Sequence, residues 1–386
     1  FPNGATWLLA KMLWVRTHEP EVWENTRRVV QMHDYFLRAI GADDYIIDLN
    51  DAGFFGLFDS TEGVWNTKLL DLFDIDEQLL PHPQPSGTAV GQVSSKGAAL
   101  CGLAEGTVIA VGAGDQSAGG IGAKVVRPGT MSISMGTAGA VVAFVDHPFR
   151  DPHARIMITN HPERGNFLLE GYQAAAAGVY RWFRDEIALW ESRTAASRGD
   201  DYYAVMDARI SAIPAGSKGL VFLPYFAGAA TPRYVSEARG AIIGLTFAHD
   251  KFCMARACME GISMDMLDMI RSMQDSGIKI DTVHILGGPT RSGIWNQIQA
   301  DIYGLPVATL AIPDASLVGA AILAGIGVRH FSSIEEGAEA LVRVDTLYEP
   351  DPQLHQRYQE LYEMYQRTFT SLHESQVFRS IATFQQ

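Results

Sequence analysis

The chain has 386 residues, more than one hydrophobic core usually holds, so we expect two domains. Apolar residues make up 47% of it and charged residues 19%, a composition typical of a globular protein with a large buried interior. The formal net charge is −14 and no long basic block occurs, which argues against a protein that grips a nucleic-acid backbone.

The sequence also lacks the pattern of a membrane or disulfide-rich secreted protein. No apolar run is long enough to cross a bilayer, and no stretch resembles a signal peptide. The three cysteines, Cys101, Cys253 and Cys258, are too few for a disulfide framework. We therefore expect a cytoplasmic protein without a membrane partner. Because the sequence opens at Phe1 and already follows an amphipathic pattern, we interpret it as a piece of a longer protein.

In chain order, the apolar pattern predicts helices and strands separated by loops. Helices are expected over residues 6–16, 20–40, 172–190, 250–274, 291–304 and 316–327. Strands are expected over residues 107–111, 130–145 (two strands joined by a turn), 166–171, 219–228 (a strand leading into a loop), 281–288 and 306–312. The alternation after residue 280 predicts an α/β domain, and the punctuation in VVRPGT predicts a domain boundary near residues 126–130.

One carboxylate, Asp115, lies among six glycines in VIAVGAGDQSAGGIGAKVVRPG, residues 108–129. An aspartate after a strand commonly caps a helix by accepting hydrogen bonds from backbone amides. Alternatively, the glycines leave room for a ligand, and Asp115 acts as a general base toward a bound hydroxyl group. Both interpretations stay open on residue type alone.

Two further glycine turns follow along the chain. SMGTAG, residues 134–139, is either a simple hairpin connection or a turn whose backbone amides and Thr137 hydroxyl meet phosphate oxygens. LGGPTRSG, residues 286–293, runs from a strand into a helix, and helix N-termini favour anions. Three such turns in one α/β chain favour a nucleotide ligand.

Histidine and cysteine residues give no metal site. Cys253 and Cys258 lie in a helical, apolar environment with His249 and are interpreted as core residues. His147, His153 and His161 match no zinc spacing and are interpreted as part of a surface loop. We assign no metal-ligating residue from the sequence.

The order of the motifs resembles the FGGY family of carbohydrate kinases, and the xylulokinases in particular. The resemblance runs nearly end to end. It includes DAGFFGLFD (51–59), GLAEGTVIAVGAGDQSAGGIGAKVVRPG (102–129), SMGTAG, RWFRDE (181–186), YFAGAATPRYVSEARGAIIGLTFAH (225–249) and LGGPTRSGIWNQIQADIYGLPV (286–307).

The resemblance implies a two-domain α/β fold of the actin/Hsp70/sugar-kinase (ribonuclease H-like) ATPase type, with the active site in the interdomain cleft. Residues 1–126 would be the remainder of the N-terminal, sugar-binding domain, and residues 127–386 the C-terminal, nucleotide-binding domain. The implied activity is ATP-dependent, Mg²⁺-assisted phosphorylation of a small sugar or polyol, first of all a ketopentose such as D-xylulose. The alternatives are a kinase of glycerol, gluconate or erythritol, and a non-catalytic sugar- or nucleotide-sensing relative. A homodimer is compatible with the resemblance.

The resemblance also implies roles for individual residues. Asp115 matches the family's catalytic base and sugar contact, and Gln116 the neighbouring sugar contact. The residues that match nucleotide contacts are Gly136, Thr137, Ala177, Arg181, Gly287, Gly288 and Ser292.

Departures from the family pattern affect the substrate and the phosphate site. Gln116 stands where xylulokinases usually have Asn and glycerol kinases have Gln. Pro289 replaces the usual third glycine, which removes one amide donor. The family's first phosphate loop, which precedes these motifs, has no counterpart in the sequence, so we expect the 386-residue chain by itself to be inactive and poorly soluble.

Overall fold

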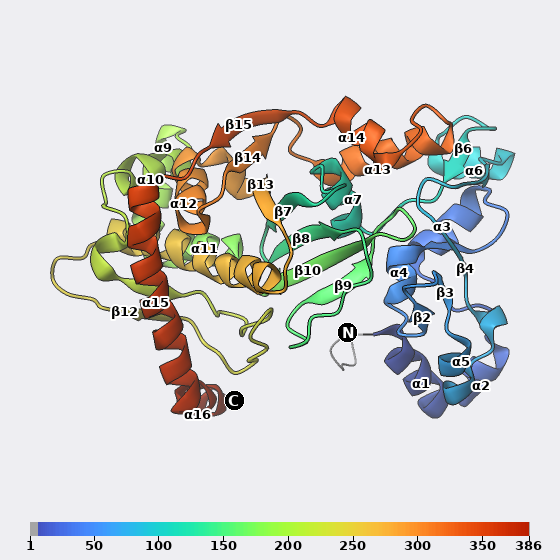
Figure 1. Ribbon diagram of the computed structural model, residues 1–386, viewed down its shortest axis with the longest axis horizontal. Coiled ribbons are helices and arrows are strands. Elements are labelled where there is room, and N and C mark those ends of the chain that lie inside the picture. The colour runs from blue at the N-terminus through green and yellow to red at the C-terminus, as the bar shows by residue number, and fades with distance from the viewer. Residues whose placement is uncertain (1–6, 386) are drawn as a thin grey trace. The chain divides into compact units, whose positions relative to one another are not determined.

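The computed structural model describes residues 7–385, which group into two compact units (Figure 1). The first unit comprises the chain up to Pro128, Ala143–Leu169 and Asp314–Arg343. The second comprises Gly129–Val142, Glu170–Pro313 and the chain from Val344 onward. The predicted boundary after residue 126 divides the chain once, whereas the chain passes between the compact units several times.

The first unit consists of short helices and small two-stranded sheets. Its helices are α1 (Leu8–His18), α2 (Pro20–Asn25), α3 (Met32–Ile40), α4 (Leu49–Gly53), α5 (Thr67–Phe73), α6 (Ser95–Cys101), α7 (Asp115–Gly122), α13 (Ala315–Gly327) and α14 (Ile334–Leu341). Its strands are β1 (Ile46–Asp48), β2 (Phe58–Asp59), β3 (Val64–Trp65), β4 (His82–Gln84), β5 (Ala89–Gln92), β6 (Val108–Ala110) and β9 (Met157–Asn160). Strand β1 pairs in parallel with β4, and β5 pairs antiparallel with β6, which leads to α7.

The helix predicted over residues 20–40 is in fact two helices, α2 and α3. Side chains satisfy the last carbonyls of α2, because Asn25 donates to Glu21 O and Thr26 donates to Val22 O. A capping box then starts α3, in which the Gln31 amide donates to the Asp34 carboxylate at 2.8 Å. Side-chain hydrogen bonds at the end of α2 and at the start of α3 therefore divide a segment whose apolar pattern is continuous. The helix predicted over residues 6–16 is α1, and its residue 6 lies outside the described residues.

A seven-stranded sheet with strand order β15-β14-β13-β7-β8-β10-β9 lies mostly in the second unit, while β9 and parts of β8 and β10 belong to the first. The strands not yet given are β7 (Gly129–Met135), β8 (Gly139–Val145), β10 (Phe167–Gln173), β13 (Ile280–Gly287), β14 (Val307–Leu310) and β15 (Val344–Tyr348). Strands β7, β13 and β14 run parallel to one another. The carboxyl ends of β7 and β13 therefore meet, with Met135 opposite Gly287.

The other elements of the second unit pack around this sheet. They are α8 (Ala177–Trp182), a π-helical stretch (Phe183–Ile187), α9 (Leu189–Arg198), α10 (Tyr202–Ile210), β11 (Val221–Leu223), β12 (Ala241–Ile243), α11 (Lys251–Asp275), α12 (Gly293–Tyr303), α15 (Pro352–Glu374) and α16 (Val377–Phe384). In α11, 19 of the 25 residues are buried, and it packs on α8, α10, α12 and β11. A helix buried on nearly all faces is a core element. Within residues 7–385, no helix combines the length and the apolar character needed to cross a membrane.

Candidate active site

The predicted base, Asp115, is the first residue of α7 in the first unit. Gly114 is the N-cap of this helix, and no side chain caps it. The Asp115 carboxylate accepts a hydrogen bond from the backbone amide of the next residue, Gln116, at 2.7 Å. Asp115 is exposed and Gln116 is half-buried. The helix-cap alternative for Asp115 is therefore wrong, although a carboxylate in a first helical turn still interacts favourably with the helix dipole.

The glycines after Asp115 serve a helix–helix contact rather than a ligand. A methyl group at Gly122 would lie 1.8 Å from the backbone oxygen of Ala315 in α13, and one at Gly319 would lie 2.0 Å from that of Ala118. Helices α7 and α13 thus approach at backbone distance (Figure 1). Ser316 also donates to the Asp115 carbonyl oxygen at 3.0 Å, so α13 holds the start of α7. The interpretation that these glycines make room for a ligand needs correction at Gly119, where a methyl group would lie 3.2 Å from Ser316 Oγ, whereas the space beside Gly112 is open.

A cluster of four ionisable side chains borders the start of α7, and sequence analysis missed it. Its members are His33, Asp34, Asp48 and Asp51, from α3, β1 and α4. His33 Nε2 lies 2.9 Å from Asp34 Oδ1 and 3.4 Å from Asp51 Oδ2. The same atom lies 3.8 Å from Asp48 Oδ2. A methyl group at Gly114 would lie 3.1 Å from Asp51 Oδ1, so the cluster touches the residue before Asp115.

Crowding of these carboxylates changes their proton affinities. Burial, together with the charge of Asp51, raises the pKa of Asp48 well above its ordinary value, and burial also raises the pKa of Asp51. Burial works to lower the pKa of His33, but the hydrogen bond and charge of Asp34 outweigh it, so this pKa is raised. His33, Asp48 and Asp51 offer ligand atoms within 4.8 Å of one another and could hold a divalent cation. In the structure the His33 imidazole forms ion pairs with the carboxylates of Asp34, Asp48 and Asp51.

In the second unit, the turn between β7 and β8 contacts helix α8. Thr137 Oγ1 accepts a hydrogen bond from Arg181 at 3.0 Å, and the Thr137 carbonyl oxygen accepts one from the amide of Ala176 at 2.9 Å. Gly136, Thr137 and Arg181 are all exposed. The structure therefore brings the predicted phosphate-contacting threonine together with Arg181, and both retain access to solvent.

The other predicted nucleotide contacts lie where β13 leads into α12. Gly287 has φ +91°, and a methyl group on it would lie 2.3 Å from Met135 O, so only glycine fits there. Gly288 has no atom within 4 Å of the corresponding position, which leaves its face open. Ser292 is the N-cap of α12, and its hydroxyl oxygen accepts from the Trp295 amide at 3.2 Å. The Ser292 side chain thus already has a structural role.

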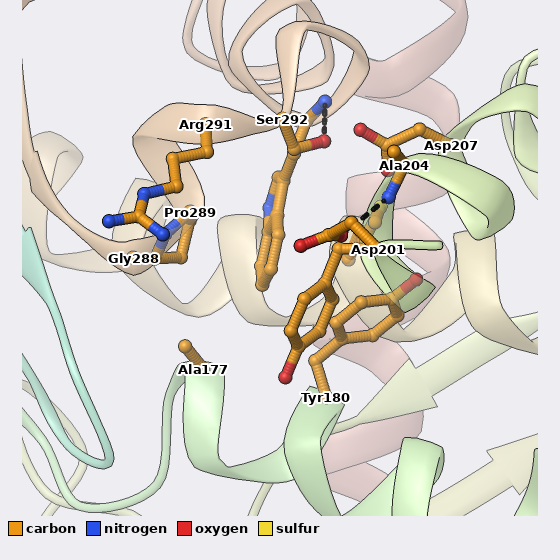
Figure 2. Close-up of a pocket in the computed structure, with 12 residues that line it drawn as sticks. Ala177, Tyr180, Asp201, Ala204, Asp207, Gly288, Pro289, Arg291 and Ser292 are labelled. Atoms are coloured by element: carbon orange, nitrogen blue, oxygen red, sulfur yellow. Dashed lines mark hydrogen bonds between the residues drawn. The ribbon is translucent and has the colours of Figure 1, made fainter. Parts of the chain in front are cut away.

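A cavity of about 380 Å³ in the second unit has Ala177, Gly288 and Ser292 in its wall (Figure 2). The other lining residues are Tyr180, Asp201, Tyr203, Ala204, Asp207, Met259, Pro289, Arg291 and Trp295. The ring of Tyr180 lies 5.4 Å from that of Trp295, edge to face, and 6.0 Å from that of Tyr203. Such a volume with aromatic walls suits a flat heterocyclic ligand.

Sequence analysis missed most of this cavity wall, including all residues from α10. Asp201, the N-cap of α10, is followed at intervals of three residues by Ala204 and Asp207 within the helix, a spacing that places them on one side of it. That spacing was visible in the sequence, but nothing in it showed that this face meets the ends of α8 and α12. Of the predicted nucleotide contacts, Gly136, Thr137, Arg181 and Gly287 are outside the cavity wall.

Comparison with known proteins identifies the fold and the family. The profile of the C-terminal domain of the FGGY family of carbohydrate kinases matches residues 131–328, and that of the N-terminal domain matches residues 5–122. The chain belongs to the FGGY family of carbohydrate kinases. Its predicted membership, its kinase class and its α/β sugar-kinase fold are thereby confirmed.

Several FGGY kinases are similar over most of this chain. The xylulose kinase of Bacillus subtilis is 31% identical over 94% of this chain and 70% of its own length. The autoinducer-2 kinase of Escherichia coli O139:H28 is 30% identical over 94% of this chain and 68% of its own length. The crystal structure of the xylulose kinase of Rhodospirillum rubrum has a TM-score of 0.85 and 29% identity, and the alignment covers 97% of this chain and 74% of that one.

Proposed function

We propose that this FGGY kinase transfers the γ-phosphoryl group of ATP to a hydroxyl group of a ketopentose such as D-xylulose, with Asp115 as the base. The observation that carries the proposal is the state of Asp115. Its carboxylate is exposed, fixed at the first turn of α7, and in no ion pair with a cationic side chain among residues 7–385. A carboxylate held in this way can accept a proton from a bound hydroxyl group.

In the proposed reaction the sugar hydroxyl oxygen forms a bond to the γ-phosphorus, and the bond from this phosphorus to the β,γ-bridging oxygen breaks. ADP leaves, and the hydroxyl proton goes to the Asp115 carboxylate. Gln116, next to the base and half-buried, is placed to bind another hydroxyl group of the sugar. The gain in rate would come mainly from positioning and charge stabilisation, as in other phosphoryl transfers.

The family uses ATP, and kinases generally bind it with Mg²⁺. A magnesium ion prefers oxygen ligands and takes one or two carboxylates together with phosphate oxygens. Asp51 lies beside Gly114, so the chain presents two carboxylates, Asp51 and Asp115, at the start of α7. This donor set fits the ion, which when bound would neutralise charge on the phosphates.

For the nucleotide we propose the cavity beside Gly288, with Thr137 and Arg181 as contacts to phosphate oxygens. The open face of Gly288 allows close approach, and the exposed hydroxyl and guanidinium groups are donors suited to phosphate. Ala177, which lines the cavity, starts the helix that carries Arg181. Ser292 would act through its capping of α12 and not through a free hydroxyl group.

Two observations bear on the sugar. Among the relatives at about 30% identity are xylulose kinases and an autoinducer-2 kinase, which supports xylulose as the first substrate to test. Gln116, in contrast, matches the residue of glycerol kinases and favours glycerol as the second candidate.

The proposal is tested with the full-length enzyme, by measuring sugar-dependent ADP release with D-xylulose, L-xylulose, D-ribulose, glycerol, gluconate and erythritol. Higher kcat/KM with a pentulose than with any other compound supports the proposal. A preference for glycerol or gluconate would mean that the enzyme catalyses the same phosphoryl transfer with that compound as the acceptor. Sugar binding without turnover in any case would mean a sensing protein and overturn the catalytic role of Asp115.

A further inference from the structure

One oxygen of the Asp201 carboxylate caps a helix, and the other faces the cavity. Asp201 is the N-cap of α10, and its Oδ1 atom accepts a hydrogen bond from the Ala204 amide at 3.0 Å. Figure 2 shows the carboxylate turned into the cavity, with the capping hydrogen bond drawn on the opposite side. The residue is exposed, so its second oxygen is accessible to a ligand.

In the part of the chain that the structure describes, no cationic side chain neutralises the Asp201 carboxylate. Among residues 7–385, no Lys, Arg or His forms an ion pair with Asp201. A second carboxylate, Asp207, lines the same end of the cavity. Burial raises the pKa of Asp207, a hydrogen bond with Ser292 works against this rise, and the charge of Asp201 adds to it. The α10 side of the cavity is therefore acidic.

A cavity with aromatic walls and an acidic end suits the base of a nucleotide better than its phosphates. Phosphates are repelled by carboxylates, so they would lie toward Gly288 and Ala177, away from α10. A base stacked against Tyr180 and Trp295 would turn its edge toward α10, where an unpaired carboxylate oxygen can only accept hydrogen bonds. The amino group of a purine is the complementary donor.

We propose that the free oxygen of Asp201 accepts a hydrogen bond from the exocyclic amino group of the purine base and thereby sets nucleotide specificity. This inference rests on the proposed binding of the nucleotide in this cavity. It assigns a specificity role to a residue outside the glycine turns, and it predicts weak binding of purines that lack the amino group.

Asp201→Asn separates this role from helix capping. Asparagine caps helices as well as aspartate does, so α10 should form normally, but the group facing the cavity becomes an amide donor. Asp250→Asn is the matched control, because Asp250 is the N-cap of α11 with the same kind of hydrogen bonds and lies outside the cavity wall. Unchanged melting temperatures would show that both variants fold.

The measurement is the equilibrium Kd of ADP, 2′-deoxyADP and purine riboside 5′-diphosphate, which lacks only the amino group. We expect the unsubstituted protein and Asp250→Asn to bind ADP about tenfold or more tightly than purine riboside diphosphate, the usual contribution of a hydrogen bond to a charged group. In Asp201→Asn this ratio should fall to within about twofold, while the ratio for 2′-deoxyADP stays unchanged.

Each of the other outcomes refutes a specific part of the proposal. If Asp201→Asn changes the 2′-deoxyADP ratio and leaves the purine riboside ratio unchanged, the carboxylate contacts ribose and the assignment to the base is wrong. If ADP binds equally well to all three proteins with the same ratios, the role of Asp201 is refuted while the nucleotide site stands. If the unsubstituted protein binds no ADP, the proposed nucleotide site fails together with this inference.

Discussion

At the scale of single residues, the exposed carboxylate of Asp115 leads to the first prediction. In the full-length enzyme, Asp115→Asn keeps the size of the side chain but removes the proton acceptor, so kcat should fall by about 10²–10⁴-fold. ADP affinity should stay within about twofold, because the base faces the sugar in the proposed reaction. The measurement is steady-state ADP release together with equilibrium ADP binding.

The control for this variant is Glu335→Gln. Glu335 is another exposed carboxylate in a first helical turn, that of α14. The Glu335→Gln substitution should leave kcat unchanged. Turnover of Asp115→Asn comparable to that of this control would exclude Asp115 as the base.

Asp265 on α11 gives a prediction about pH. Burial raises its pKa to about 7, and the charge of Asp268 adds to this rise, although Arg233 works against it. A carboxyl group whose pKa is raised in the folded protein favours folding below its unfolded pKa near 4, and this contribution is lost as the pH rises through 7. The loss amounts to at most about 4 kcal/mol.

Asp265→Asn cannot ionise, so it should abolish this loss of unfolding free energy between pH 4 and pH 7, measured by urea denaturation. Asp250→Asn should behave differently. Amide hydrogen bonds, above all that of Cys253, lower the pKa of Asp250, so its contribution is present above pH 4 and lost on acidification. Equal pH profiles of the unsubstituted protein and Asp265→Asn would contradict the prediction.

At the scale of secondary-structure elements, the contact of α7 with α13 gives a third prediction. Gly319→Ala places a methyl group 2.0 Å from the backbone oxygen of Ala118, so the helices must separate. Overpacking of this kind costs about 1–3 kcal/mol, and rigid backbone atoms place this site at the upper end. We expect a lower urea midpoint and, in the full-length enzyme, also a lower kcat, since α13 holds the first residue of α7 through Ser316.

Ala320→Ser is the control for Gly319→Ala, because it adds an atom to the exposed face of the same helix. It should change neither the urea midpoint nor kcat. A Gly319→Ala protein with an unchanged midpoint would mean that the two helices can move apart freely.

The elements also show which parts of the molecule could be predicted from the sequence. Strands β7, β8 and β13 and helices α11 and α12 lie close to their predicted ranges, because long apolar runs and terminal polar residues define them locally. The break between α2 and α3 was missed, because it depends on side-chain capping and on a hydrogen bond from Val29 to Leu79 far along the chain. Likewise, His161 was expected on a surface loop but is buried at the end of β9, where burial lowers its pKa to about 3.

The candidate site likewise contains some residues that the sequence indicates and others that only the structure shows. Turns with glycine next to a polar residue mark Asp115, Thr137 and Gly288 in the sequence. The His33 cluster and the wall formed by α10 consist of ordinary polar residues that acquire their meaning only when three separate segments meet. Local patterns therefore indicate the residues that we propose as reactive groups, whereas the residues that we propose to set charge and specificity come together only in the tertiary structure.

At the scale of the whole molecule, the two compact units should respond to different ligands. ADP should slow amide hydrogen exchange in residues 177–182, 201–210 and 287–295 of the second unit, by up to about 100-fold at a concentration of 100 Kd. D-xylulose should slow exchange mainly in residues 112–117 of the first unit. Protection by ADP confined to the first unit would contradict the proposed nucleotide site.

The interrupted course of the chain through the two units has a consequence for its synthesis. Helix α7 ends at Gly122, and its partner α13 begins at Ala315, about 190 residues later. A ribosome adds roughly 5–20 residues per second, so α7 emerges roughly 10–40 s before the helix against which it packs. The first unit is begun early but stays open until Arg343 has been added, when most of the second unit is already made. Its folding is therefore completed late in translation, and the newly made α7 is a segment that a chaperone would encounter uncovered.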